Sequence, residues 1–137
     1  MPIDASLIGK SSAPRTFEVT EEAVRRFMEA TGDPALQSDA PLLYAPPTFP
    51  TTFRGMRVPG LELDGSKMQL LHGEQQFRYA RRLRIGEQVT CTVRVLDVRE
   101  RAGRSGPMTF IISETTGVDS QQQPIFIALS TGIVRQQ

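Results

Sequence analysis

The chain has 137 residues, of which 39% are hydrophobic and 23% charged, and its net charge is +1. These values are typical of one soluble globular domain, which we place at residues 1–137. With so small a net charge, there is no electrostatic reason to expect a nucleic acid or an anionic membrane as partner. The apolar runs are shorter than the roughly 20 residues that span a bilayer, so we expect no membrane segment.

Cys91 is the one cysteine and therefore cannot form an internal disulfide. It alternates with Val89 and Val93, which predicts a buried position on a strand. Burial in apolar surroundings raises the pKa of a thiol, so we expect a structural role rather than a nucleophilic one. A lone buried thiol without a leader pattern indicates a reducing, cytoplasmic location.

The N-terminal part begins with small and polar residues at 1–14, which predict an arm that docks late or stays mobile. Alternation over residues 15–19 predicts a short strand. Thr20 and Glu21 are typical of a helix start, and Gly32 is typical of a helix end. Four residues between them fall at helical spacing: Val24, Phe27, Met28 and Thr31.

A proline-rich stretch follows, with irregular loop expected over residues 33–47. Residues 47–56 are apolar and do not alternate, and the prolines suit a helix start, where a missing N–H has no intrahelical partner. We expect a short buried helix here that stops near Gly55 and Pro59.

The rest of the chain is uniformly of β type. Strands are expected at residues 71–79, 89–98, 108–112 and 125–134. Up to Val95 the apolar residues of the second of these strands alternate at odd-numbered positions, whereas Leu96 and Val98 are apolar at even-numbered ones. This change of face predicts a bulge. The last strand carries apolar residues at both odd and even positions, and therefore on both faces, which predicts a central place in the sheet or a subunit contact.

One short apolar helix followed by long strands indicates an α+β protein, in which about five antiparallel strands wrap around a central helix. This is the hot-dog architecture. The outer face and one edge of such a sheet need covering, so we expect dimerisation.

Few residue types that carry chemistry are present. With a single histidine and no motif for zinc or for a phosphate loop, we expect no metal and no cofactor. The remaining candidates are the carboxylates Asp33 and Asp39, the hydroxyls Thr48, Thr51 and Thr52, and the pair His72 and Glu74. His72 could act as a general base, although a sole histidine can equally be a structural hydrogen-bonding residue.

The start of the expected central helix could polarise a thioester carbonyl that gains negative charge. Because proline removes donors, the possible N–H groups are those of Thr48, Phe49 and Thr51. The alternative is that this segment only starts a buried helix. A basic cluster of Arg78, Arg81, Arg82 and Arg84 could meet the phosphates of coenzyme A or an acidic acyl carrier protein, or could be a solvated edge.

Four segments carry a family resemblance: FMEATGDP at 27–34, APPTF at 45–49, LHGEQQFRY at 71–79 and RLRIGE at 82–87. In this order they resemble the N-terminal MaoC-like, or FAS1-like, dehydratase domain. The last segment resembles the family stretch R-P-L-x-x-G-D, with Arg82 in place of the proline and Glu87 in place of the aspartate. The resemblance covers residues 8–135.

The resemblance implies a hot-dog fold and dehydration of (R)-3-hydroxyacyl thioesters of coenzyme A or acyl carrier protein, or the reverse hydration. It also implies a homodimer or a heterodimer with another hot-dog subunit. Asp33 matches the family's catalytic aspartate, but the Asn and His of the following N-P-x-H motif are absent here.

Three functions follow. The first is a dehydratase or hydratase that uses Asp33 and His72, with Pro47, Thr48, Phe49 and Thr51 at the substrate. In it Tyr44, Arg82 and Arg84 also contact the substrate or its carrier. The second is a non-catalytic acyl-thioester-binding subunit of a heteromeric dehydratase. The third, a hot-dog thioesterase, needs a carboxylate on the central helix, and residues 47–56 contain none.

Overall fold

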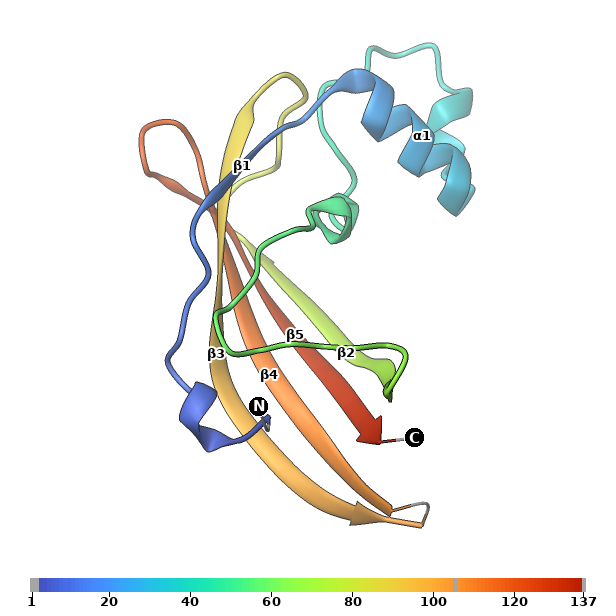
Figure 1. The fold of residues 1–137 in the computed structure, drawn as a ribbon. Coiled ribbons are helices and arrows are strands. Elements are labelled where there is room, and N and C mark those ends of the chain that lie inside the picture. Colours follow the sequence, from blue (N-terminus) through green and yellow to red (C-terminus); the bar gives the residue numbers. More distant parts are fainter. Residues whose placement is uncertain (1–2, 105, 137) are drawn as a thin grey trace.

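The computed structural model describes residues 3–104 and 106–136. Its main element is one curved five-stranded antiparallel sheet (Figure 1). The strand order across the sheet is β1-β3-β4-β5-β2. The strands are β1 (Arg15–Glu18), β2 (Met68–Tyr79), β3 (Gln88–Gly103), β4 (Gly106–Val118) and β5 (Pro124–Gln136). The expected antiparallel sheet of about five strands is confirmed.

Helix α1 (Glu21–Thr31) lies beyond one end of the sheet (Figure 1). The Thr20 side chain accepts a hydrogen bond of 3.1 Å from the Ala23 N–H and caps the helix start. Gly32 ends the helix in the left-handed conformation, with φ of 70°. Val24 and Met28 are buried, so the helix predicted from spacing is confirmed.

The bulge predicted in the third strand is also confirmed. The pairing of β3 with β4 shifts register between Val95 and Asp97, which leaves Leu96 as the extra residue. β5 lies between β4 and β2, and its consecutive residues Ile125 and Phe126 are both buried. The last strand is therefore central, as its apolar pattern predicted.

The expected helix over residues 47–56 is much shorter in the structure. Only a single 3₁₀ turn, η3 (Phe49–Thr52), forms there. The hydroxyl groups of Thr51 and Thr52 donate to the carbonyl oxygens three residues before them, and Phe53 continues in an extended conformation. Such local side-chain bonds and the fixed φ of Pro50 favour a tight turn over a longer α-helix.

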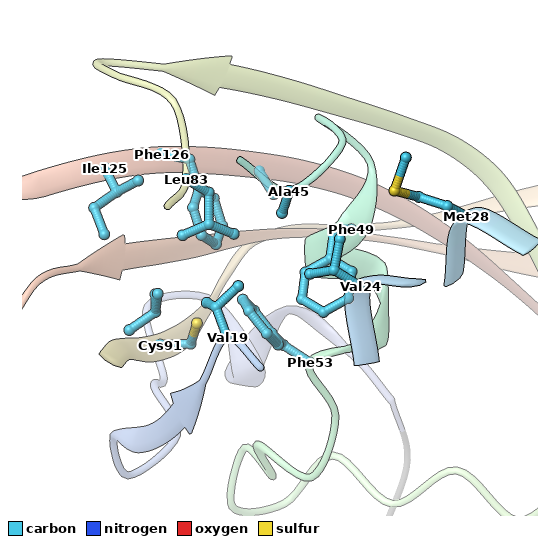
Figure 2. Close-up of a cluster of buried hydrophobic side chains, with 12 residues drawn as sticks. Val19, Val24, Met28, Ala45, Phe49, Phe53, Leu83, Cys91, Ile125 and Phe126 are labelled. Carbon is cyan, nitrogen blue, oxygen red and sulfur yellow. The ribbon is translucent and has the colours of Figure 1, made fainter. Parts of the chain in front are cut away.

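The position predicted for this segment is nevertheless correct. Phe49, Pro50 and Phe53 are buried. Figure 2 shows Phe49 and Phe53 packed beside Val24 of α1 and within the cluster that includes Cys91 of β3. Burial raises the pKa of Cys91 to about 12, which supports the structural role expected for it.

The N-terminal arm is docked along β3 over its described part, residues 3–14, whereas residues 1–2 lie outside the described part. It contains the 3₁₀ turn η1 (Ala5–Leu7), and Leu7 is only 2% exposed. The N–H groups of Gly9 and Ser12 donate to β3 carbonyl oxygens at 2.8 Å. Among the described residues, no helix has the length and apolar character needed to cross a membrane.

Candidate functional site

Two loops pair with each other at the end of the sheet where α1 lies. The Ala45 N–H donates to the Leu83 carbonyl oxygen at 2.9 Å, and the Ile85 N–H donates to the Leu43 carbonyl oxygen at 3.0 Å. Ala45 and Leu83 are 6% and 1% exposed. The pairing therefore fixes the backbone on both sides of Tyr44, which forms an isolated bridge with Arg84.

This pairing borders a cavity of about 620 Å³, which we call the first cavity. Most of its lining is apolar, including Met28, Leu42, Leu43, Pro46, Pro47 and Leu83. Four polar or charged side chains also line it: Asp33, Tyr44, Tyr79 and Arg82. A largely apolar cavity with a few polar groups is typical of a small-molecule site.

Tyr79, at the end of β2, ties the sheet to the segment before η3. Its hydroxyl donates a hydrogen bond of 2.5 Å to the Pro47 carbonyl oxygen. Burial raises the pKa of Tyr79 to about 12, so the phenol stays protonated and remains a donor at neutral pH. The sequence does not single out Tyr79; the available signal is its alternation with Phe77, which puts both side chains on the same, half-buried face of β2.

Asp33 lies between α1 and the 3₁₀ turn η2 (Pro34–Gln37) and lines the first cavity. Its carboxylate accepts the Ala35 N–H at 3.0 Å and so caps η2. The carboxylate keeps further acceptor positions for a ligand, because each oxygen can accept more than one hydrogen bond. The other candidate carboxylate, Asp39, is exposed in the proline-rich loop.

His72 lies elsewhere, exposed on the edge strand β2, where the pairing with β5 shifts register between His72 and Glu74. It lines a second cavity of about 320 Å³ together with Pro50 and Thr51. Asp33 lines the first cavity, so within one chain the two residues open onto different cavities. Among the residues that the structure describes, no three His, Cys, Asp or Glu side chains form a metal-binding group.

Of the three backbone N–H groups expected as donors near η3, two already donate hydrogen bonds within the chain. The Phe49 N–H donates to the Pro46 carbonyl oxygen at 2.9 Å, and the Thr51 N–H donates to the Thr48 carbonyl oxygen at 3.1 Å. Within residues 3–104 and 106–136, no hydrogen bond uses the Thr48 N–H. Thr48 is an exposed residue next to Pro47, which lines the first cavity, although Thr48 itself does not.

The four arginines of the basic cluster separate into two kinds. Arg81 forms an ion pair with Glu87 through two hydrogen bonds, of 2.7 and 3.0 Å, and reaches Asp119 at 3.4 Å. Arg82 stacks on Tyr44, with its guanidinium carbon 3.9 Å from the ring centroid. Arg78 and Arg84 are exposed. The sequence alone does not separate Arg81 from the other arginines, because the fold of the loop brings Glu87 to it and the sheet brings Asp119.

Burial favours the protonated form of Glu87, but the hydrogen bonds from Arg81 and from the Arg84 N–H outweigh it and lower the pKa of Glu87. The Gln123 N–H, with the Gln121 N–H and Arg81, lowers the pKa of Asp119. Both carboxylates therefore stay ionised at neutral pH. Together with Arg81 they join the loop beside the first cavity to the β4–β5 turn.

A family model, described as the FAS1-like dehydratase domain region, matches residues 6–128. The chain belongs to the FAS1-like dehydratase domain family. A UPF0336 protein of Streptomyces coelicolor is 38% identical in an alignment that covers 75% of this chain and 78% of that protein. The name of this relative states no activity.

Solved structures of similar fold include chains of two complexes from Mycobacterium tuberculosis. A chain of the HadBC (3R-hydroxyacyl-ACP dehydratase) complex has a TM-score of 0.68 and 18% identity, with 96% of this chain and 99% of that chain covered. A chain of the ChsH1–ChsH2 complex has a TM-score of 0.67 and 20% identity, with 90% and 83% covered. At such low identities the similarity shows the fold alone. This chain therefore has the hot-dog fold that its sequence predicts.

Proposed function

We propose that this chain is an acyl-thioester-binding subunit of a heteromeric (R)-3-hydroxyacyl thioester dehydratase. Its catalytic histidine would then come from a second hot-dog subunit. The observation that carries the proposal is the place of the one histidine, which opens onto a different cavity from Asp33. Removal of water across a carbon–carbon bond needs a base and an acid at one reacting centre, and Asp33 has no imidazole in its own cavity.

The first cavity supplies what such a subunit contributes. Its apolar lining can bury an acyl chain. Thr48 follows the lining residue Pro47, and its N–H, which no hydrogen bond within the described residues uses, is the donor that we propose for the thioester carbonyl oxygen. Assembly with another hot-dog subunit is supported by the two similar structures, since each is a chain of a complex. The substrate class is supported by the family and by the HadBC complex, a 3R-hydroxyacyl-ACP dehydratase.

A second candidate is a homo-oligomeric dehydratase in which Asp33 and His72 come from two copies of the chain. The observation that favours it is the position of His72 on β2, an edge strand, where a second copy could bring it to another cavity. A thioesterase is less well supported, because η3 carries no carboxylate.

The test is hydration of crotonyl-CoA, followed by loss of the enoyl absorbance. We expect the purified chain to be inactive alone and active after mixing with a hot-dog subunit that carries the Asp–His pair. Hydration by the chain alone, lost in His72→Ala and kept in the exposed β2 control Gln76→Ala, would instead establish the homo-oligomeric enzyme. No hydration with any such subunit, together with no binding of an acyl thioester, would reject both.

A further inference from the structure

We infer that the Tyr44–Arg82 stack at the first cavity binds the phosphate of a phosphopantetheine arm, the group that carries the acyl thioester. This inference rests on the proposed function and adds to it the part of the carrier that is recognised. Tyr44 and Arg82 are called the stacked pair below. Arg82 stands where the family stretch R-P-L-x-x-G-D has proline, so the stacked pair is a feature of this chain and not of the motif.

The geometry of the stacked pair leaves the hydrogen-bonding edge of the guanidinium free. The guanidinium carbon of Arg82 lies 3.9 Å from the centroid of the Tyr44 ring, so one face of the planar group is covered. Arginine donates hydrogen bonds in its plane, and stacking does not use these donors. Within the described part of the chain, the Arg82 side chain has no ion pair and donates no hydrogen bond. Its five N–H groups are therefore available to an anion.

The backbone on each side of the stacked pair is held in place. The flanking residues Ala45 and Leu83 are buried and hydrogen-bonded to each other. The Arg81 guanidinium donates to the Arg82 carbonyl oxygen at 3.0 Å, and Arg81 is itself fixed by its two hydrogen bonds to Glu87. A guanidinium held in this way loses less conformational entropy on binding than a free surface arginine.

The surroundings of the stacked pair match the chemistry of the arm. Arg82 is exposed and also lines the first cavity, so its charge lies at the boundary between solvent and an apolar interior. A phosphopantetheine thioester has the same order of groups, with an anionic phosphate at one end and an uncharged chain that leads to the acyl group. Asp33 brings a negative charge to the cavity, but its carboxylate already accepts the Ala35 N–H and has no ion pair with Arg82 among the described residues.

The test measures the contribution of the phosphate to binding. Butyryl-pantetheine and butyryl-phosphopantetheine differ only in the phosphate, and both are saturated, so neither can be hydrated. We expect the wild-type chain to bind the phosphorylated compound about tenfold more tightly in calorimetric titration, as for one charge-assisted contact. In Arg82→Gln this ratio should fall to about one, and in Arg82→Lys it should lie between these values, because lysine keeps the charge without the planar fork.

Arg101→Gln is the matched control, because Arg101 also lies over an aromatic ring, that of Phe110 at 5.7 Å, but does not line the first cavity. This variant removes the same charge and should keep the tenfold ratio. A ratio near ten in Arg82→Gln, or near one in the wild type, would overturn the phosphate site while leaving the proposed function intact. Failure of the wild type to bind either compound would overturn both.

Coenzyme A and acyl carrier protein both carry this arm. Titrations of wild type and Arg82→Gln with butyryl-CoA and with butyryl-acyl carrier protein distinguish the two sources. The natural carrier is the one whose affinity falls about tenfold in Arg82→Gln and stays unchanged in Arg101→Gln. Unchanged affinity for both carriers would overturn the inference.

Discussion

The Tyr79 hydroxyl at the end of β2 donates a hydrogen bond of 2.5 Å to the Pro47 carbonyl oxygen, 32 residues earlier in the chain. Pro47 lines the first cavity, whereas Pro50 and Thr51 of η3 line the second. The bond therefore fixes the segment between the two cavities to the sheet. Proline cannot donate a backbone hydrogen bond, so the carbonyl oxygens of Pro46 and Pro47 are the groups through which this segment can be held.

Tyr79→Phe should lower the free energy of unfolding by about 1 kcal/mol, the usual value of one hydrogen bond. The ring would keep its packing against Phe126, since their centroids lie 5.8 Å apart. Tyr44→Phe is the control, because the Tyr44 hydroxyl makes no hydrogen bond to the described residues, and its stability should be unchanged. Urea unfolding at pH 7 measures both variants. Equal stability of Tyr79→Phe and wild type would show that the bond contributes nothing.

The same residue predicts a loss of stability at high pH. Burial raises the pKa of Tyr79 from 10.0 to about 12 in the folded state. The unfolded chain therefore loses this proton first, and the stabilisation that is complete below pH 10 declines as the pH rises towards 12. Stability measured over this window should fall less steeply in Tyr79→Phe. Cys91 adds to the decline from about pH 9 in both proteins, so parallel curves would contradict the prediction.

Glu87→Gln should destabilise the protein at neutral pH by on the order of 1–3 kcal/mol, because it leaves a half-buried Arg81 with its main partner uncharged. Because folding lowers the pKa of Glu87, its ionised carboxylate stabilises the fold at pH values above its ordinary pKa of 4.5. This contribution is lost as the pH falls below that value and through the lowered pKa of the folded state. Wild-type stability should therefore fall with acid more steeply than that of the variant.

Glu22→Gln provides the comparison for this ion pair. Glu22 pairs with Arg26 at 2.7 Å on the solvent face of α1, where both side chains are more than 70% exposed. Exposed pairs of this kind contribute about 0–1 kcal/mol, so this variant should be close to wild type at every pH. If the two variants had equal effects in urea unfolding, the network around Arg81 would have no special role.

Gly55→Ala and Gly86→Ala should destabilise the protein to a similar extent, because both glycines have a positive φ, of 97° and 95°. Each variant should lose about 1–2 kcal/mol from backbone strain. A Cβ at Gly55 would lie 1.8 Å from a terminal nitrogen of Arg15, whereas nothing lies within 4 Å of a Cβ at Gly86. That nitrogen is the far end of an exposed side chain that can move away, so an Arg15→Ala background should leave the effect of Gly55→Ala unchanged in urea unfolding. A larger loss at Gly55 that disappears with Arg15→Ala would contradict this prediction.

The sequence predicted those features of the fold that depend on residues close together in the chain. The cap at Thr20, the end of α1 at Gly32 and the bulge at Leu96 follow from residues a few positions apart, and each is found where the sequence placed it. The burial of the η3 segment was predicted because its apolar side chains have no other place in a single-layer sheet. Its length was not, since the turn is ended by the hydroxyls of Thr51 and Thr52 rather than by Gly55.

The candidate site could be predicted only in part, because its geometry is set by contacts between distant segments. Asp33, Tyr44, Pro47 and Arg82 were all named from the sequence, and the structure brings all four to the first cavity. The position of His72 at a different cavity depends on strand order, with β2 paired to β5 at the edge of the sheet. No spacing in the sequence reveals that order.

Thr48→Pro tests the backbone donor proposed for the thioester carbonyl. Proline removes the Thr48 N–H, while Thr48→Ala keeps it and removes only the side chain, so the two variants separate the N–H from the hydroxyl. Proline is disfavoured at this place, because Thr48 is the third residue of the turn closed by the Phe49 N–H and the Pro46 carbonyl oxygen, and its φ of −92° lies outside the proline range. We therefore expect a loss of stability in Thr48→Pro, which urea unfolding measures, and the two variants are compared under conditions in which both are folded. A carbonyl that accepts this hydrogen bond should show a lowered stretching frequency in isotope-edited infrared spectra of bound butyryl-CoA. The shift should persist in Thr48→Ala and disappear in Thr48→Pro, and hydration by the assembled complex should fall about 10²-fold in Thr48→Pro alone. A shift that survives in Thr48→Pro would assign the carbonyl contact to another donor.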